Sequence, residues 1–208
     1  KVTYGVLKAV DFGVPQDRQR AIFLGQLGEL EISLPQSNGI RTTVKDAIYD
    51  LPFIGSGEGT EESTYDKEPI SEFAKEMRQN ATILHNHVAT SHSKLALERL
   101  ALIPKGAGKE VLPAEHRTKS IYSGTWCRLI EDGVATTITT RFDTPSSGRF
   151  THPILNRCVT VREAARLQTF PDDFVFYGTK TVQMKEVGNA VPPFLAREIA
   201  RTIAKNEK

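Results

Sequence analysis

The sequence predicts an α/β fold in which a short sheet and a final helix flank a mixed, irregular α+β region. Three features carry this prediction. Two short apolar runs rich in β-forming residues open the chain, at residues 2–10 and 21–25. Residues 105–150 mix basic, polar and aromatic residues without a sustained period, which is typical of irregular backbone. Residues 193–208 have the amphipathic period of a helix.

The two opening runs are expected to be strands joined by a turn. Pro15 has no N–H to donate to a neighbouring strand, so residues 16–20 are placed in the connection and at the start of the second strand. In an extended segment, alternate side chains point the same way. Gln16, Arg18 and Arg20 are therefore expected to share one face.

The middle of the chain is expected to hold short helices and little sheet. Residues 42–52, 71–78 and 93–103 are good helix candidates, because Thr or Ser residues can cap their starts and Pro follows the first and third. Residues 55–64 are rich in Gly, Ser, Thr and Glu, which indicates a flexible boundary. A strand is expected at residues 134–140, where four of the seven residues are Thr.

Thr160 and Glu163 have the spacing of a capping box, which predicts a helix that runs to about Gln168. Arg162 and Arg166 lie one turn apart on this helix. Structural ion pairing is expected here, and Thr160, Arg162, Glu163 and Arg166 are given a structural role.

The last helix is expected to begin at Pro192 or Pro193, since proline is favoured in a first helical turn. One stripe of this helix is apolar and should dock on the sheet. A second stripe is basic. The apolar stripe is Leu195, Ile199 and Ile203, and the basic one is Arg197, Arg201 and Lys205.

Composition excludes several classes of protein. With 39% hydrophobic residues among 208, a mean hydropathy of -0.32 and no apolar run of membrane-spanning length, the chain is expected to be soluble and cytoplasmic, with no membrane partner. Cys127 and Cys158 are too few for a disulfide framework. His85, His87 and His92 lack a set of Cys or carboxylate partners at ligand spacing, so no metal site is expected.

The net charge of +2 hides an uneven distribution. Residues 58–76 are acidic, whereas residues 105–128 and 141–166 are rich in Lys and Arg. Clustered cations suit a phosphate-binding face, and the competing interpretation is two solvated surfaces. The first interpretation makes Lys105, Lys109, Arg128 and Arg141 the candidate phosphate contacts, and the resemblance described below implies that the partner is double-stranded DNA.

Three strings occur in the order of the last three conserved blocks of the DNA cytosine-5 methyltransferases. They are Gln16-Asp17-Arg18-Gln19-Arg20, the string from Thr160 to Pro171, and Gly188-Asn189-Ala190-Val191-Pro192-Pro193. They resemble blocks VIII, IX and X of the bacterial restriction-modification branch. Thr137 and Ile138 resemble a signature of the target recognition region, and are expected to contact DNA.

The resemblance implies roles for individual residues. Arg20 would donate to the 2-oxo group of an extruded cytosine, Arg18 would support the catalytic loop, and Gln16 would line the same pocket. Asn189, Ala190 and Val191 would lie beside S-adenosylmethionine, the cofactor of the complete enzyme. A Gly-Asn turn just before a helix start should also expose amides that suit the cofactor's carboxylate.

The same resemblance divides the chain. Residues 1–40 would be strands of the catalytic domain, a remnant of a Rossmann-like methyltransferase sheet. Residues 41–182 would be the small domain with the target recognition region, and residues 183–208 would return to the catalytic domain.

Blocks I to VI, including the nucleophilic Cys that follows Pro and the Gly-rich cofactor loop, find no match in this sequence. We therefore expect the C-terminal part or subunit of such an enzyme, inactive alone and needing an N-terminal methyltransferase half. The exposed sheet could instead form a homodimer. The alternative is a DNA-binding or protein-interaction module that has lost catalysis.

Overall fold

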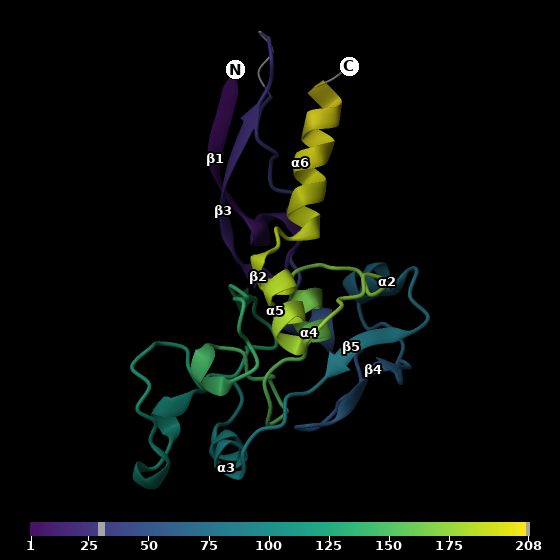
Figure 1. The fold of residues 1–208 in the computed structure, drawn as a ribbon. Helices are drawn as coiled ribbons and strands as arrows, with labels where there is room; N and C mark the ends of the chain where they lie inside the picture. The colour runs from purple at the N-terminus through teal and green to yellow at the C-terminus, as the bar shows by residue number, and fades with distance from the viewer. Residues whose placement is uncertain (29–31, 207–208) are drawn as a thin grey trace.

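The computed structural model describes residues 1–28 and 32–206, which form two lobes (Figure 1). In the hairpin lobe, strands β1 (Val2–Lys8) and β3 (Gln19–Gly25) lie beside helix α6 (Pro193–Asn206). The main lobe contains the remaining helices and strands, and the start of β1 and the end of α6 lie at the far end of the hairpin lobe. The mixed α/β class expected from the sequence is confirmed.

Strands β1 and β3 pair antiparallel, with Val2 opposite Gly25 and Lys8 opposite Gln19. One face of this pair is covered. There the Cδ1 atom of Leu34 lies only 2.6 Å from where a side chain at Gly5 would begin. The other face is open to solvent and apolar. Its large side chains are Val2, Tyr4, Val6 and Phe23, each more than 60% exposed.

A short 3-10 turn, η1 (Ala9–Phe12), leads from β1 to β2 (Gln16–Asp17), which pairs parallel with β6 (Ala135–Thr136). The strand expected at residues 134–140 is therefore much shorter. The strand ends there because the next backbone groups form hydrogen bonds with side chains and not with a neighbouring strand. The N–H of Ile138 donates to Gln16 Oε1, and its C=O accepts from Arg18.

Three predicted helices are confirmed with their caps. Helix α1 (Val44–Ile48) begins with a capping box between Thr43 and Asp46, and it is shorter than expected. Helix α2 (Glu72–Arg78) and helix α3 (Lys94–Leu102) each begin after a serine whose side chain accepts from a backbone N–H of the first turn. The capping residues are Ser71 and Ser93.

Two strands and one α-helix were not expected. The presumed flexible boundary is strand β4 (Gly59–Ser63), which pairs antiparallel with β5 (Leu84–Val88). The sequence of β4 lacks the alternation of apolar and polar residues that indicates a strand, because β4 is exposed along most of its length. Helix α5 (Lys180–Asn189) was not expected from the sequence, because its last residues, Gly-Asn, usually form a turn. In the structure, its N-cap residue makes no side-chain hydrogen bond.

Helix α4 (Val161–Leu167) lies at the centre of the main lobe, and all seven of its residues are buried. Its apolar side chains join the principal hydrophobic core, whose members run in sequence from Ala9 to Phe194. Three short 3-10 turns, η2 (Lys109–Val111), η3 (Ala114–His116) and η4 (Pro145–Ser147), lie in the irregular region. In the described part of the chain, no helix is long and apolar enough to cross a membrane.

Candidate functional site

The side chain of Arg18 joins three distant segments of the chain. It is 2% exposed, and its Nη1 atom donates to the carbonyl of Ile138 at 2.8 Å. Its Nη2 atom donates to the carbonyls of Gly188 at 2.7 Å and Ala190 at 3.1 Å. A guanidinium stays charged and presents several donors in one plane, so it can hold these carbonyls together.

Gln16 extends the same network toward α4 and is fully buried. Its Nε2 atom donates to the carbonyl of Leu167 at 3.1 Å and to Gln168 Oε1 at 2.9 Å. Gln168 in turn donates to the carbonyl of Val187 at 2.7 Å. Two side-chain amides thus link β2, the end of α4 and the end of α5.

Arg20 has different surroundings. It lies on β3, is half-buried, and donates from Nη1 to the carbonyl of its neighbour Gln19. Burial alternates along this segment, since Asp17 and Gln19 are exposed whereas Gln16 and Arg18 are buried and Arg20 is half-buried, and this agrees with the expected common face. Most of the donors of Arg20 are not used within the described chain, which leaves them for a ligand.

The segment Gly188-Asn189-Ala190-Val191 lies next to Arg18, which donates to two of its carbonyls. Asn189 is exposed and Val191 is 43% exposed. Gly188 is buried against the loop after β6, where an added Cβ would lie 2.3 Å from the carbonyl oxygen of Thr139. Only glycine permits this approach, and it brings the end of α5 against the Thr-rich loop.

The Gly-Asn turn expected here is instead the end of α5, so Asn189 lies in that helix and not in a turn before α6. Pro192 and Pro193 have no N–H groups. The first amide of α6 that could bind an anion, that of Phe194, donates to Thr169 Oγ1 at 3.0 Å. This amide is therefore already paired within the protein, and the anion site at the start of α6 stays a prediction.

Asn189 and Val191 form an exposed edge at the end of α5. An exposed amide beside an exposed valine suits a ligand with both polar and apolar parts, such as S-adenosylmethionine. The carbonyls of Gly188 and Ala190 are already occupied by Arg18, which leaves the side chains of the segment free to face outward. These residues fit one border of such a site.

The charged residues of α4 are buried and paired. Arg166 makes a bidentate contact with Asp172 at 2.6 Å and also binds Asp50. Burial opposes the charges, but the ion pair outweighs it, raising the pKa of Arg166 and lowering that of Asp172. Arg162 donates to the backbone carbonyls of His85, Pro171 and Phe174.

Glu163 closes the capping box with Thr160 and pairs with Arg157 at 2.7 Å. Burial opposes ionisation of Glu163, but the ion pair outweighs it and holds its pKa well below the usual range. His152 lies 3.9 Å from Glu163, and burial lowers the pKa of His152 to about 3. The Nδ1 atom of His152 accepts from the N–H groups of Ile154 and Leu155, so the ring is neutral.

His87 is also held neutral, by burial that lowers its pKa. Its Nε2 atom faces the carbonyl of Pro52 at 2.9 Å, and its Nδ1 atom faces Thr160 Oγ1 at 3.0 Å. Since a carbonyl only accepts, Nε2 carries the proton. His87 and the buried Asn86 therefore belong to the core, on strand β5.

Five of the six expected DNA contacts fall into two groups, and the sixth, Lys109, is half-buried and donates to backbone carbonyls of its own chain. Thr137, Lys105 and Arg141 have exposed side chains, with Lys105 paired to Glu131 at 3.1 Å and Thr137 donating to the carbonyl of Asp17. Ile138 and Arg128 are buried. Arg128 binds only internal groups of those described: the carbonyls of Leu100, Ile103, His152 and Leu155 and the side chain of Asn156.

Burial changes the interpretation of the basic segments. Arg157, Arg162 and Arg166 are fully buried in ion pairs and carbonyl contacts, so residues 141–166 do not form a continuous phosphate-binding face. The acidic stretch around β4 and α2 lies on the opposite side of the main lobe from the irregular loops near η2 and η3 (Figure 1).

The cysteines and histidines offer no further chemistry. Cys127 and Cys158 are buried free thiols, and burial raises the pKa of both, with Asp143 adding to the effect at Cys158. Such thiols are poor nucleophiles at neutral pH. Within residues 1–28 and 32–206, no three His, Cys, Asp or Glu side chains are grouped to hold a metal ion.

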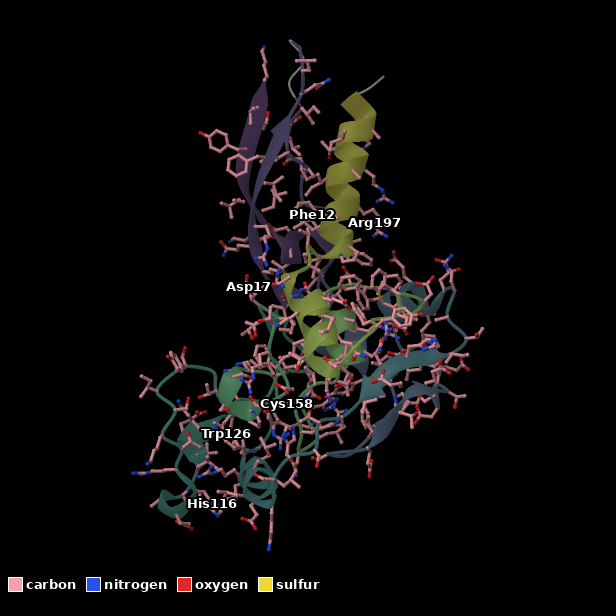
Figure 2. All side chains as sticks on the ribbon, in the orientation of Figure 1. Phe12, Asp17, His116, Trp126, Cys158 and Arg197 are labelled. Atoms are coloured by element: carbon pink, nitrogen blue, oxygen red, sulfur yellow. The ribbon has the colours of Figure 1, made fainter. Side chains whose placement is uncertain are left out.

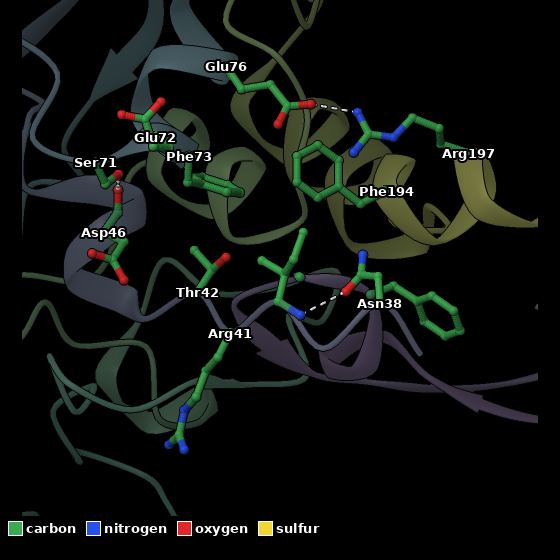
Figure 3. Close-up of a pocket in the computed structure, with 13 residues that line it drawn as sticks. Asn38, Arg41, Thr42, Asp46, Ser71, Glu72, Phe73, Glu76, Phe194 and Arg197 are labelled. Carbon is green, nitrogen blue, oxygen red and sulfur yellow. Dashed lines mark hydrogen bonds and ion pairs between the residues drawn. The ribbon is translucent and has the colours of Figure 1, made fainter. Parts of the chain in front are cut away.

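A cavity of about 330 Å³ lies where the lobes meet, away from these arginines (Figure 3). Phe73 of α2 and Phe194 of α6 form part of its wall, with their rings edge to face at 5.7 Å. Arg197 of α6 pairs with Glu76 of α2 at its rim. These contacts attach α6 to the main lobe.

The joined segments are those that resemble the methyltransferase blocks, and a comparison with protein families identifies the chain as a member of the C-5 cytosine-specific DNA methylase family. The family model matches residues 1–205. Enzymes of this family take the methyl group from S-adenosylmethionine.

Bacterial type II methyltransferases are among the relatives. The chain is 34% identical to M.DdeI of Desulfomicrobium norvegicum, over 98% of this chain and 54% of that protein. It is 37% identical to M1.HphI of Haemophilus parahaemolyticus, over 99% of this chain and 48% of that protein. The chain thus spans about half the length of the curated relatives it matches.

A solved structure has the same fold. It is a prophage-encoded E. coli protein described as a DNA modification methyltransferase, with a TM-score of 0.75 and 28% identity. The match covers all of this chain and 61% of that one.

Proposed function

We propose that this chain supplies DNA recognition, and part of the cytosine and S-adenosylmethionine pockets, to a DNA cytosine-5 methyltransferase. The observation that carries the proposal is the set of hydrogen bonds from Arg18 to the carbonyls of Ile138, Gly188 and Ala190. It holds the strand that bears Arg20, the Thr-rich loop and the Asn189 segment in a fixed relationship. Residues that serve one base and one methyl donor must be positioned in this way.

In this proposal, Arg20 donates to the 2-oxo group of an extruded cytosine. A base can be methylated on its ring only after it leaves the stack, and the polar edge of the extruded base then needs donors. Arg20 fits because most of its N–H groups are uncommitted in the described chain. Arg18 and Gln16 act through position, because their donors bind the protein itself.

The thiol nucleophile is assigned to an N-terminal catalytic portion, on the same or a separate polypeptide. Neither cysteine of this chain follows a proline, and burial raises the pKa of both thiols. The apolar face of the β1–β3 pair is the proposed dock for that portion. Two strands with large exposed side chains, such as Tyr4 and Phe23, do not make a complete sheet.

The test is reconstitution. The chain is mixed with an N-terminal methyltransferase portion that contains the Pro-Cys loop, and transfer of a labelled methyl group from S-adenosylmethionine to duplex DNA is measured. We expect activity from the mixture and none from the chain alone. Activity of the chain alone would overturn the assignment of the nucleophile, and an inactive but well-formed complex would overturn the proposed function.

Arg20→Met is the matched variant in this assay. We expect it to lose at least about a hundredfold in kcat with folding unchanged, because a donor to the developing charge on the ring is removed. Arg201→Met serves as the control, since Arg201 lies exposed on α6 and pairs with Glu198. Sedimentation of the chain alone distinguishes the competing use of the apolar face, a homodimer.

A further inference from the structure

A loop projects from the main lobe between η2 and the buried Trp126, and its tip is apolar. The loop lies around His116 and Trp126 in Figure 2. Ile121 is 88% exposed and Tyr122 is 74% exposed. Single exposed apolar residues are common, but two large ones together at the end of a projecting loop are not what solvation favours.

The loop is held in shape from inside by Lys109. The ammonium of Lys109 donates to the carbonyls of Ser120 and Tyr122 and to Thr125 Oγ1, at distances of 2.5 to 3.1 Å. Thr125 Oγ1 also donates to the carbonyl of Tyr122 at 3.0 Å. The backbone on both sides of Ile121 is thus fixed, so the two side chains are presented without a further cost of ordering the loop.

The other arm of the loop is fixed by Arg99 of α3. Its Nε atom donates to the carbonyl of His116 at 2.9 Å, and its Nη2 atom donates to that of Arg117 at 3.3 Å. The guanidinium also lies 5.4 Å from the ring of Trp126. These contacts anchor the base of the loop to a helix.

The charge of the tip indicates its partner. Residues 117–125 include Arg117 and Lys119 and no carboxylate. Both basic side chains are exposed. Glu115 and Glu110 lie just outside this stretch, and Glu110 accepts from the N–H of Gly108. A basic loop with an apolar end suits a groove lined by phosphates in which apolar base surface is exposed.

We propose that Ile121 and Tyr122 form a wedge that contacts base pairs of duplex DNA, while Arg117 and Lys119 bind the flanking phosphates. The inference rests on the proposed function and adds the residues that recognise the base sequence of the DNA. Ile121 offers a surface for a thymine methyl group, and Tyr122 offers a ring that stacks on a base and a hydroxyl at its edge. Two side chains are too few for a stable protein interface, which buries roughly 800 Å² per partner.

The experiment is selection from a pool of duplexes with a randomised core, using this chain and its variants. The double variant Ile121→Ala/Tyr122→Ala is expected to lose about tenfold or more in preference at one or two adjacent base pairs, with an unchanged dependence of affinity on salt. Lys119→Ala should keep the preference and reduce the slope of log affinity against log salt by about one. Tyr177→Ala is the control, because Tyr177 is 76% exposed on another part of the main lobe.

The outcomes separate the wedge from the proposed function. If the double variant selects the same bases as the unmodified chain, or if the unmodified chain binds DNA with no base preference, the wedge is overturned and DNA recognition stands. If the unmodified chain shows no salt-dependent binding to duplex DNA, both are overturned. All substituted side chains are exposed, and a thermal melt of each variant verifies that its fold is intact.

Discussion

The Nη2 atom of Arg18 lies 2.7 Å from the carbonyl oxygen of Gly188, across 170 positions of sequence. This hydrogen bond joins the segment that resembles block VIII, residues 16–20, to the end of α5. An arginine buried to 98% costs free energy unless its donors are satisfied, and here backbone carbonyls satisfy most of them. Arg18 therefore has a structural role within the protein, whereas Arg20, two residues on, remains available to a ligand.

Replacing Arg18 with Met should destabilise the chain by about 3–5 kcal/mol, because it removes charged hydrogen bonds and leaves buried carbonyls unpaired. The free energy of unfolding in urea measures this. Arg20→Met, as the control, should change it by less than about 0.5 kcal/mol. Equal losses for the two variants would contradict the separation of roles.

Gly188→Ala should also destabilise, by about 1–3 kcal/mol, since the added Cβ would lie 2.3 Å from the carbonyl oxygen of Thr139 and the two segments must move apart. Helix propensity alone would favour alanine here, so the sign of the effect tests the contact. Lys185→Ala, on the exposed side of α5, is the matched control. If the Gly188→Ala variant is as stable as the original chain, the loop that contains Thr139 can move away from α5 at no cost in free energy.

Local signals in the sequence predicted much of the fold. Capping residues such as Thr43, Ser71, Ser93 and Thr160 found four helices, because a cap is a contact within one turn of the chain. Helix α5 was missed because its end depends on the distant contact of Gly188 with Thr139. Strand β4 was missed because its exposed polar residues do not alternate with apolar ones.

The site was predicted less well, for a related reason. The sequence places Arg18, Arg128 and Lys109 among cations, and nothing local distinguishes a cation that binds DNA from one that binds carbonyls of its own chain. Burial makes that distinction, and burial is decided by packing. The projecting pair Ile121 and Tyr122 gave no signal either, because exposure of an apolar residue is visible only in the folded chain.

Acid should destabilise the chain from about pH 6.5 downward. Burial lowers the pKa of His152 to about 3, whereas an unfolded histidine titrates near 6.5, so between these values the unfolded state binds one more proton. The free energy of unfolding thus falls as pH falls, by about 2 kcal/mol from pH 6.5 to 5 for His152 alone. His87, with a lowered pKa, adds to the loss, and Glu163 and Asp172 add below about pH 4.5.

The matched variant for this titration is His152→Asn. Its side-chain oxygen can still accept from the N–H groups of Ile154 and Leu155, but it does not titrate. Unfolding in urea at several pH values should give a slope shallower by about one proton between pH 6.5 and 5. An unchanged slope would mean that His152 is not the titrating group.

Lys109 gives the sharpest distinction between a phosphate contact and an internal clamp. Lys109→Met removes three donated hydrogen bonds from the loop that carries Ile121 and Tyr122. If Lys109 only shapes the loop, affinity for duplex DNA and preference for bases should both fall severalfold, while the slope of log affinity against log salt stays the same. A slope reduced by about one with preference retained would instead assign Lys109 to a phosphate. Lys105→Met should give that second result, because Lys105 is 63% exposed and reaches only Glu131 among the described residues.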